Sequence, residues 1–225
     1  GLRRSATGVL KILFDKKIGI SLDKLMPEAD RGAHGAISNS HAKKNMDPQE
    51  SQKKLKAFFA DRFKALLADR GYREDLTEAA MAARFDSPHE VFSRVQALSQ
   101  FSKKSFFLNA CKVVERTHNI LKGQDPKSLP SRPDRALFAE PLEHAVMEKL
   151  DLHEGNITLA KKEGDFARAT SLYAEAFFDT LNEFFDKVFI NAEDLGVRKN
   201  RLSLLKAIKE LYTGDIADLS KIQNP

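Results

Sequence analysis

The 225-residue sequence has one cysteine, no tryptophan and no apolar run near the roughly 20 residues that a membrane-spanning helix needs. The single cysteine, Cys111, excludes a disulfide within the chain and is typical of a reducing compartment, so we expect a cytoplasmic protein that does not enter a membrane. Its apolar helical surroundings favour a small core residue over a nucleophile. The start, Gly1-Leu2-Arg3-Arg4, is no secretory signal, and without an initiator methionine the chain is expected to be a fragment.

The motifs of several catalytic sites are also missing. No His-Asp pair occurs, which excludes a phosphohydrolase of the HD type, and neither glycine-rich nucleotide-binding motif is present. His89-Glu90 and His153-Glu154 lack the second histidine of a metalloprotease helix, while His34 and His41 have no partner at a metal-binding spacing. We therefore expect no catalytic site, metal or cofactor in this chain.

Helical periodicity is the main pattern that is present. Apolar residues recur every three or four positions through most of the chain, and no strand-like alternation is sustained. The sequence predicts an all-α fold, an irregular helix bundle. Helix starts are expected at Asp47-Pro48 and at the capping box of Ser87 and Glu90. A short helix over 22–26 is expected to stop at Pro27, and 29–46 is expected to be a linker or mobile loop.

The charge balance is mildly basic. There are 37 lysines and arginines against 32 acidic residues, which gives a net charge of +5 and a pI of about 9.2. This excess suits an RNA partner, but many helical proteins with exposed charged faces have a similar balance. The overall charge therefore does not identify the partner, and only local sequence patterns can indicate it.

The most informative stretch is the predicted helical hairpin over 181–205. Its first helix has two apolar rows, so we expect burial on more than one side. The first row consists of Tyr173, Phe177, Leu181, Phe184 and Val188. The second row consists of Phe178, Phe185 and Phe189. An acidic turn, Glu193-Asp194, leads to a second helix. That helix begins with the basic cluster Arg198-Lys199-Asn200-Arg201.

The same stretch resembles the C-terminal signature of the β subunit of bacterial-type glycyl-tRNA synthetase. The matching residues are Phe184-Phe185-Asp186, Val188, Glu193-Asp194, Arg198, Asn200-Arg201-Leu202 and Leu204-Leu205. Weaker similarities lie at 1–14, 55–76 and 116–122. The resemblance implies a helical anticodon-binding domain over 47–225, related to that of class I aminoacyl-tRNA synthetases. Residues 1–28 would be the remnant of an HD-like domain, with 29–46 as the linker.

The resemblance also implies a function. The fragment would bind tRNA(Gly) and recognise its anticodon within an α2β2 enzyme, a glycine–tRNA ligase in which the α subunit activates glycine with ATP. The fragment itself would have no cofactor and no catalytic site. The alternative is a non-catalytic scaffold for protein interactions, whose basic tip binds an acidic protein.

The candidate RNA-binding residues are Arg198, Lys199, Asn200, Arg201, Arg116, Lys122 and Lys206. Arg198 and Asn200 could contact base edges, whereas Lys199 and Lys206 could contact phosphates. The helix N-terminus is expected to add free backbone N–H groups that favour phosphate. The alternative for Asn200 and Arg201 is a structural role, in which Arg201 pairs with Glu193 or Asp194 and orients the turn.

Overall fold

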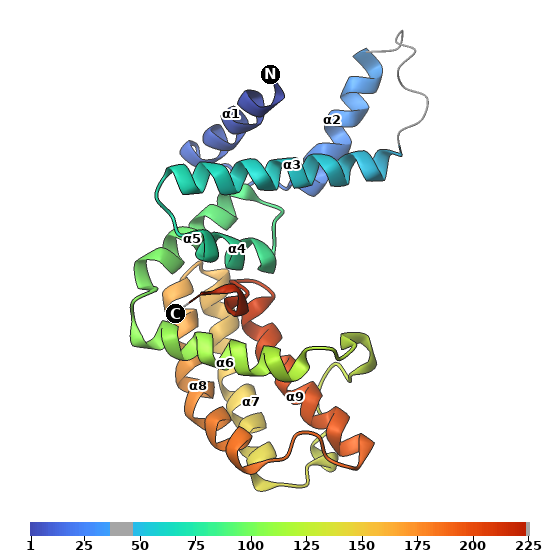
Figure 1. Cartoon of the computed structure of the whole chain (residues 1–225), viewed down its shortest axis with the longest axis vertical. Helices are drawn as coiled ribbons and strands as arrows, with labels where there is room; N and C mark the ends of the chain where they lie inside the picture. Colours follow the sequence, from blue (N-terminus) through green and yellow to red (C-terminus); the bar gives the residue numbers. More distant parts are fainter. Residues whose placement is uncertain (37–46, 224–225) are drawn as a thin grey trace. The chain divides into compact units, whose positions relative to one another are not determined.

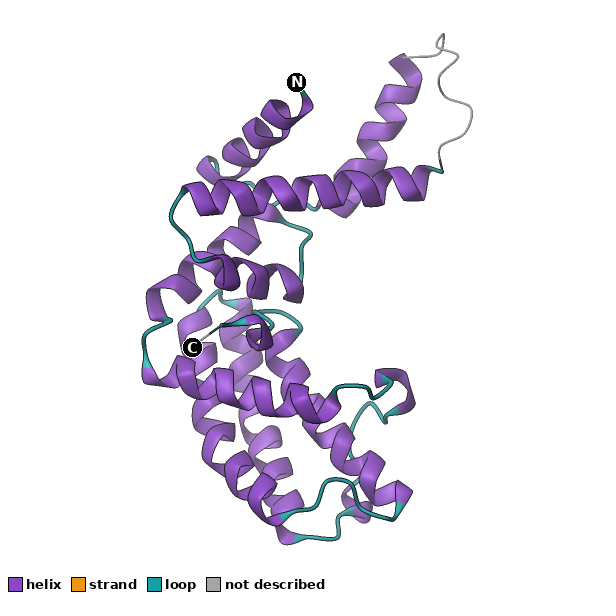
Figure 2. Cartoon of the chain, viewed as in Figure 1, coloured by secondary structure: helices purple, strands orange, loops and turns teal. Residues whose placement is uncertain are grey.

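The computed structural model describes residues 1–36 and 47–223, and in these residues helices are the only regular secondary structure (Figures 1 and 2). The all-α prediction is therefore confirmed for the described part of the chain. The α-helices are α1 (Leu2–Asp15), α2 (Leu22–Ala36), α3 (Pro48–Asp69), α4 (Glu74–Ala83), α5 (Pro88–Phe101), α6 (Ser105–Leu121), α7 (Pro141–Lys162), α8 (Phe166–Lys187) and α9 (Leu195–Thr213). Short 3₁₀ turns are η2 (Pro126–Ser128), η3 (Arg135–Leu137) and η4 (Leu219–Lys221).

The chain forms two compact units, Gly1–Gln96 and Ala97–Pro225, and the boundary between them falls within α5. These units do not follow the boundaries at 28 and 46 that were expected from the sequence, and the assignment of those segments to domains stays a prediction. Within the expected linker, residues 29–36 belong to α2. Residues 37–46 lie outside the described residues.

The core of the first unit is aromatic and is organised by α3, which contacts α1, α2 and α4 (Figure 1). Phe14 of α1 stacks on Phe92 with ring centroids 4.6 Å apart and meets Phe63 edge to face at 5.5 Å. All three rings are buried. Such pairs stabilise a core beyond the apolar area that they bury.

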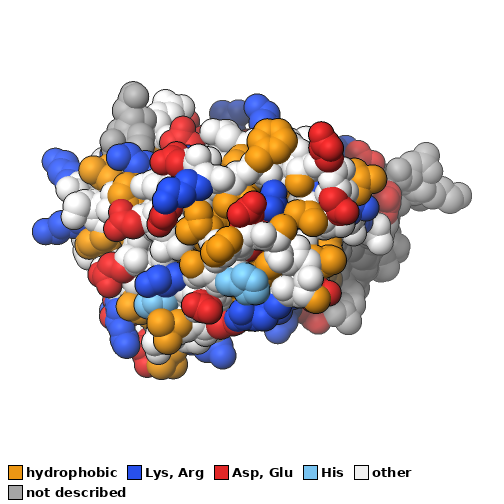
Figure 3. Space-filling view, turned by 90° about the horizontal axis from the view of Figure 1, so that it is seen from below, with side chains coloured by type: hydrophobic (Ala, Val, Ile, Leu, Met, Phe, Trp, Pro, Cys, Tyr) orange, Lys and Arg blue, Asp and Glu red, His pale blue; other side chains and the backbone are white. Residues whose placement is uncertain are grey.

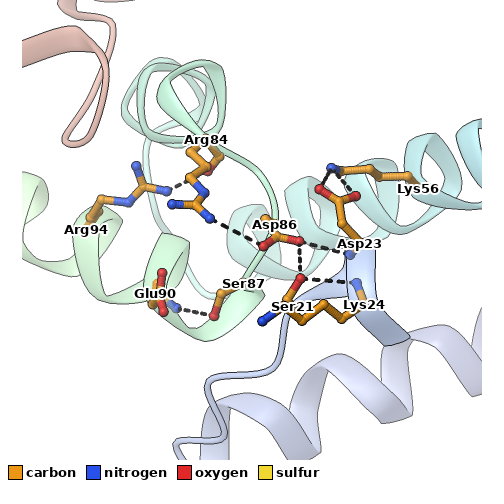
Figure 4. Close-up of polar contacts among 9 residues, drawn as sticks. All are labelled: Ser21, Asp23, Lys24, Lys56, Arg84, Asp86, Ser87, Glu90 and Arg94. Atoms are coloured by element: carbon orange, nitrogen blue, oxygen red, sulfur yellow. Dashed lines mark hydrogen bonds and ion pairs between the residues drawn. The ribbon is translucent and has the colours of Figure 1, made fainter. Parts of the chain in front are cut away.

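A buried carboxylate holds the start of α2. Asp86 accepts hydrogen bonds from the Ser21 hydroxyl and the Asp23 backbone N–H, both at 2.9 Å, and thereby caps a helix more than 60 residues away in sequence (Figure 4). Burial alone raises the pKa of Asp86, but these two hydrogen bonds, with the charges of Lys56 and Arg84, bring the pKa below its ordinary value. The ionised carboxylate is therefore the form that stabilises this unit.

Two of the expected helix starts are confirmed. Asp47 caps α3 by accepting from the Gln49 N–H at 3.0 Å, and Ser87 accepts from the Glu90 N–H at 3.5 Å. The expected stop at Pro27 is wrong, because α2 continues through this proline. Proline removes one backbone hydrogen bond, the one to the carbonyl of Asp23, and the first turn of α2 is already anchored by Asp86.

Arg94 of α5 is a buried charged residue in this unit. The sequence pattern places it on the polar face of α5, but the residue is only 5% exposed and its guanidinium donates to the Arg84 carbonyl (Figure 4). The hydrogen bond satisfies a backbone carbonyl where α4 has ended, and this permits burial of the charged side chain.

The second unit is built on the antiparallel pair α7 and α8, joined by a short turn at Glu163–Asp165, with α6 packed on α8 and α9. The predicted apolar face of α8 is buried: Tyr173, Phe177, Leu181 and Phe184 are at most 1% exposed. Gly155 does not break α7. No helix among the described residues is both long and apolar enough to cross a membrane.

Candidate nucleic-acid interface

Asn200, one of the predicted RNA-binding residues on α9, is buried. It is 1% exposed, and its side-chain amide forms two hydrogen bonds with the backbone of Asp134. The amide oxygen accepts from the Asp134 N–H at 2.7 Å, and the amide nitrogen donates to the Asp134 carbonyl at 2.8 Å. The Asn200 side chain thus supplies the hydrogen bonds that a neighbouring backbone segment would otherwise give to the loop before α7. Because this side chain is buried and already has its partners, its placement does not support contact with RNA.

Arg201 is also buried, and it forms an ion pair with Glu143 of α7. Its Nε donates to Glu143 at 3.1 Å, and the side chains of the two residues are 6% and 0% exposed. Nη1 of Arg201 donates to the Phe189 carbonyl at 2.7 Å. Glu143 in turn accepts from the backbone N–H groups of Ala139 and Glu140 at 2.8 and 2.7 Å. This network satisfies a buried charge pair and fixes two loop segments.

The expected pairing of Arg201 with Glu193 or Asp194 is therefore wrong. The carboxylate of Asp194 instead caps α9, accepting from the backbone N–H groups of Gly196 and Val197 at 2.7 and 2.9 Å. These N–H groups are then unavailable to a phosphate, and the cap itself is negative, which also corrects the expectation of free donors at this helix end.

Further along α9, two side chains hold the loop between α6 and α7. The Ser203 hydroxyl donates to the Pro130 carbonyl at 3.0 Å, and the Lys206 ammonium donates to the Pro126 carbonyl at 2.8 Å. Together with Asn200 they occupy positions three residues apart, which lie on one helical face. This face of α9 is a loop-holding face, and Lys206 already has an internal partner.

Arg198 and Lys199 are the two residues of the basic cluster that reach solvent. Lys199 is exposed and Arg198 is half-buried. The preceding Leu195 is 66% exposed, and the Asp194 carboxylate lies at the same helix end. The tip thus combines two cations with an anion and an apolar side chain, which is a weak site for phosphate.

The loop between α8 and α9 presents an aromatic ring that the sequence pattern assigned to a helical row. Helix α8 ends at Lys187, and Val188 has an extended backbone with φ −111° and ψ 121°. In extended chain, successive side chains point in opposite directions. Val188 and Ile190 are accordingly buried at 5% and 8% exposure, whereas Phe189 is 72% exposed. The alternation of β-branched residues around Phe189 is the signal that could have predicted this.

Phe189 lies at an open pocket of about 660 Å³ between the C-terminal end of α6 and the α8–α9 loop. The pocket is lined by Arg116, Asn119, Ile120, Lys122, Gln124, Phe185, Val188, Phe189, Ile190 and Asn191. Two of the predicted RNA-binding residues, Arg116 and Lys122, are therefore brought together here. They do not share this pocket with Arg198 or Lys199.

Arg116 is held in place on the pocket wall. Its guanidinium carbon is 4.6 Å from the centre of the Phe185 ring, a cation–π contact. The same group donates to the side-chain oxygen of Asn182 and lies 3.7 Å from the carboxylate of Asp186. The planar cation is thus oriented before any ligand binds.

Further cations lie near the C-terminal end of α6. The Lys209 ammonium is 3.2 Å from Nδ1 of His118. Burial lowers the pKa of His118, and the positive charges of Lys209, Lys221 and Lys122 lower it further, against the opposite effect of Asp218. The neutral imidazole is favoured because the ring is partly buried and several ammonium groups lie near it.

On the molecular face shown in Figure 3, basic and acidic side chains are interspersed and hydrophobic side chains lie between them. A site on such a face depends on local geometry more than on a field of one sign. Among the described residues there is no group of His, Cys, Asp and Glu that could hold a metal ion. The aromatic rings and cations of the pocket suit binding of a planar or anionic ligand.

Two family models match the chain. The model described as glycyl-tRNA synthetase beta subunit matches residues 1–82, and the model described as DALR anticodon binding domain matches residues 112–214. Together they account for most of both units, and the second model spans the pocket and the start of α9.

Curated relatives agree with these models. Glycine–tRNA ligase beta subunits of Ruegeria sp. and Geotalea daltonii are 30% and 31% identical to the chain over 226 and 221 residues. The beta subunit of Enterobacter sp. is 31% identical over 222 residues. These alignments cover 98–99% of the chain, whereas the chain spans about 30% of the length of each relative. The chain belongs to the family of glycyl-tRNA synthetase β subunits and represents the region that contains the DALR anticodon-binding domain.

Proposed function

We propose that the chain is the tRNA-binding, anticodon-recognising part of a glycyl-tRNA synthetase β subunit. The observation that supports this most directly is the DALR anticodon-binding match over 112–214. It includes all residues of the Phe189 pocket, the half-buried Arg198 and the exposed Lys199 of the α9 tip. The pocket offers an aromatic ring, oriented cationic groups and amides, which are the groups that recognise unpaired RNA bases.

In this function the chain contributes binding and positioning, not bond chemistry. It would bind tRNA(Gly) at the anticodon while an α subunit, in an α2β2 assembly, activates glycine with ATP and esterifies the distant acceptor end. We infer a cytoplasmic location and no cofactor bound to this chain. Its contribution to glycylation would then be seen as a lower KM for tRNA in the assembled enzyme, because uniform binding of the substrate changes KM more than kcat.

A binding titration tests the proposal. The pure chain is titrated with tRNA(Gly), with the same tRNA carrying a substituted anticodon, and with polyglutamate, at several salt concentrations. We expect tRNA(Gly) to bind tightest and log affinity to fall linearly with log salt, with a slope set by the number of phosphate contacts. Equal affinity for the three ligands would contradict anticodon recognition, and a preference for polyglutamate would favour the acidic-protein scaffold.

A further inference from the structure

We propose that the pocket between α6 and the α8–α9 loop binds a single unstacked base of the tRNA anticodon loop, with Phe189 as the stacking surface and Arg201 as the residue that positions it. The inference rests on the proposed function and adds the subsite and the residues responsible. Nothing in the family match names this pocket, and neither Phe189 nor the buried pair of Arg201 and Glu143 was expected from the sequence to form it.

The exposure of Phe189 is the first argument. All 16 phenylalanines of the chain lie in the described residues, and the others are buried or half-buried whereas Phe189 is 72% exposed. An apolar ring of this size in contact with water raises the free energy of the unbound protein, and burying it against a ligand recovers that free energy. Bases of single-stranded RNA stack on such rings regardless of sequence, because every base has a π face.

The second argument is that the backbone carrying the Phe189 ring is held in place. Arg201 donates to the Phe189 carbonyl at 2.7 Å, and the same guanidinium is fixed by the fully buried Glu143. The neighbours Val188 and Ile190 are buried and anchor the loop on both sides. The loop is therefore ordered before binding, which reduces the entropy lost when a base stacks on it.

The remaining walls of the pocket supply polar recognition. Asn119, Gln124 and Asn191 line it, and no hydrogen-bond partner for their side-chain amides is found among the described residues. An amide offers both donors and acceptors and can pair with the edge of a base. Arg116, stacked on Phe185, presents a planar cation, and Lys122 can neutralise the adjoining phosphate. The volume of about 660 Å³ lies within the range of small-ligand sites.

These features favour a nucleobase over an acidic peptide. A peptide carboxylate would use the cations but leave the exposed ring and the three amides without a role. A stacked base uses all of them at once, since its face meets Phe189 while its edge meets the amides. The pocket therefore predicts recognition of one base position, not attraction to negative charge in general.

The experiment uses the full 225-residue chain and a set of tRNA(Gly) molecules, each with 2-aminopurine at one position of the anticodon loop. Stacking of this base on an aromatic ring quenches its fluorescence. The variants are Phe189→Ala, Phe189→Leu and Phe189→Tyr, with Leu152→Ala as the matched control. Leu152 is a similarly exposed apolar residue of the same unit, at 68%, and lies outside the pocket.

We expect quenching at one position of the loop in the wild-type chain and in Phe189→Tyr. Phe189→Ala and Phe189→Leu should lose this quenching and bind tRNA about 5- to 150-fold more weakly. Leu152→Ala should behave as wild type. The melting temperature should be unchanged in all variants, because residues 189 and 152 are both exposed. Loss of quenching with Leu but not with Tyr identifies aromatic stacking as the cause.

Two results would overturn the inference in distinguishable ways. If wild type binds tRNA(Gly) with anticodon preference but Phe189→Ala has the same affinity and fluorescence, the base pocket is wrong and the proposed function stands. If wild type shows no preference for tRNA(Gly) over the tRNA with a substituted anticodon, the proposed function fails and the pocket fails with it.

Discussion

The two units of the chain both bury a charged group, but they use it for different purposes. In the first unit, Asp86 accepts two hydrogen bonds at the start of α2, so the buried charge joins one helix to another part of the core. In the second unit, the pair of Arg201 and Glu143 holds backbone groups of two loops, at Phe189 and at 139–140. The first arrangement stabilises the start of a helix, and the second fixes two loop segments, one of which carries the exposed Phe189.

The basic cluster of α9 is divided by the buried pair of the second unit into inner and outer residues. Its inner residues, Asn200 and Arg201, hold loops, whereas its outer residues, Arg198 and Lys199, face solvent. A sequence match at these positions therefore does not by itself indicate RNA contact. The residues that the loops present, above all Phe189, are better placed for that contact.

The largest expected effect comes from breaking the buried pair of the second unit. Arg201→Met leaves the Glu143 carboxylate buried without its charged partner, which costs about 3–5 kcal/mol of folding free energy. Urea unfolding followed by circular dichroism measures this. Arg132→Met is the matched control, because Arg132 is 53% exposed in its ion pairs and its loss should cost less than about 1 kcal/mol. Equal losses in the two variants would show that the buried pair has no special role.

Asn200→Ala should have a smaller but clear effect on stability. It removes both hydrogen bonds to the backbone of Asp134, and we expect a loss of about 1–3 kcal/mol. Anticodon preference in tRNA binding should persist, because the side chain is buried. Asn119→Ala, at an exposed position of the pocket, should show the opposite behaviour, with an unchanged melting temperature and weaker preference. If both variants changed the melting temperature and the anticodon preference in the same way, Asn200 and Asn119 would not have the different roles assigned to them here.

The exposed half of the cluster is expected to contribute modestly to binding. Replacing Arg198 and Lys199 by alanine should weaken the binding of every tRNA to a similar extent and leave folding intact. If both side chains contact phosphates, the slope of log affinity against log salt should fall by about 1.4, using about 0.7 per contact with single strands. An unchanged slope in a salt titration would place the docking surface elsewhere on the second unit.

The smallest effect concerns the first unit and depends on pH. The folded-state pKa of Asp86 is below its ordinary value of 3.8, so its stabilisation is present above pH 3.8 and is lost as pH falls through the folded pKa. Asp86→Asn should therefore lower stability by about 0.3–1 kcal/mol at pH 7, since a charged cap is replaced by a neutral one. The difference in melting temperature from wild type should shrink toward pH 2.5. A difference that is constant with pH would contradict a role for the charge.

Local patterns in the sequence were sufficient to predict the helical fold and several of its details. The period of three to four residues predicted the buried face of α8, and the caps at Asp47 and Ser87 were found from residue types next to each other. The stop at Pro27 was wrong because α2 continues through this proline, and its first turn is held by the distant Asp86 as well as by the adjacent Ser21. A prediction made from neighbouring residues cannot include the contact between Asp86 and the start of α2.

The site was predicted less well, for the same physical reason. The partner of Arg201 is Glu143, 58 residues earlier, whereas the acidic residues nearby in sequence were the expected partners. The exposure of Phe189 depends on the end of α8 two residues before it, and helix ends are the least predictable part of a periodic pattern. Arg116 and Lys122, two of the candidate RNA-binding residues, line one pocket because both lie near the end of α6, and their contact with RNA stays a prediction.

The central claim is that Arg201 supports RNA recognition by positioning Phe189, and a double-mutant cycle tests it most directly. Affinity for tRNA(Gly) is measured for wild type, Phe189→Ala, Arg201→Met and the double variant, at a temperature where melting curves show all four to be folded. We predict that Arg201→Met weakens binding in the wild-type background and adds little in the Phe189→Ala background, because both changes remove the same stacking contact. Additive losses of affinity would contradict the claim, since Arg201 would then affect binding independently of Phe189.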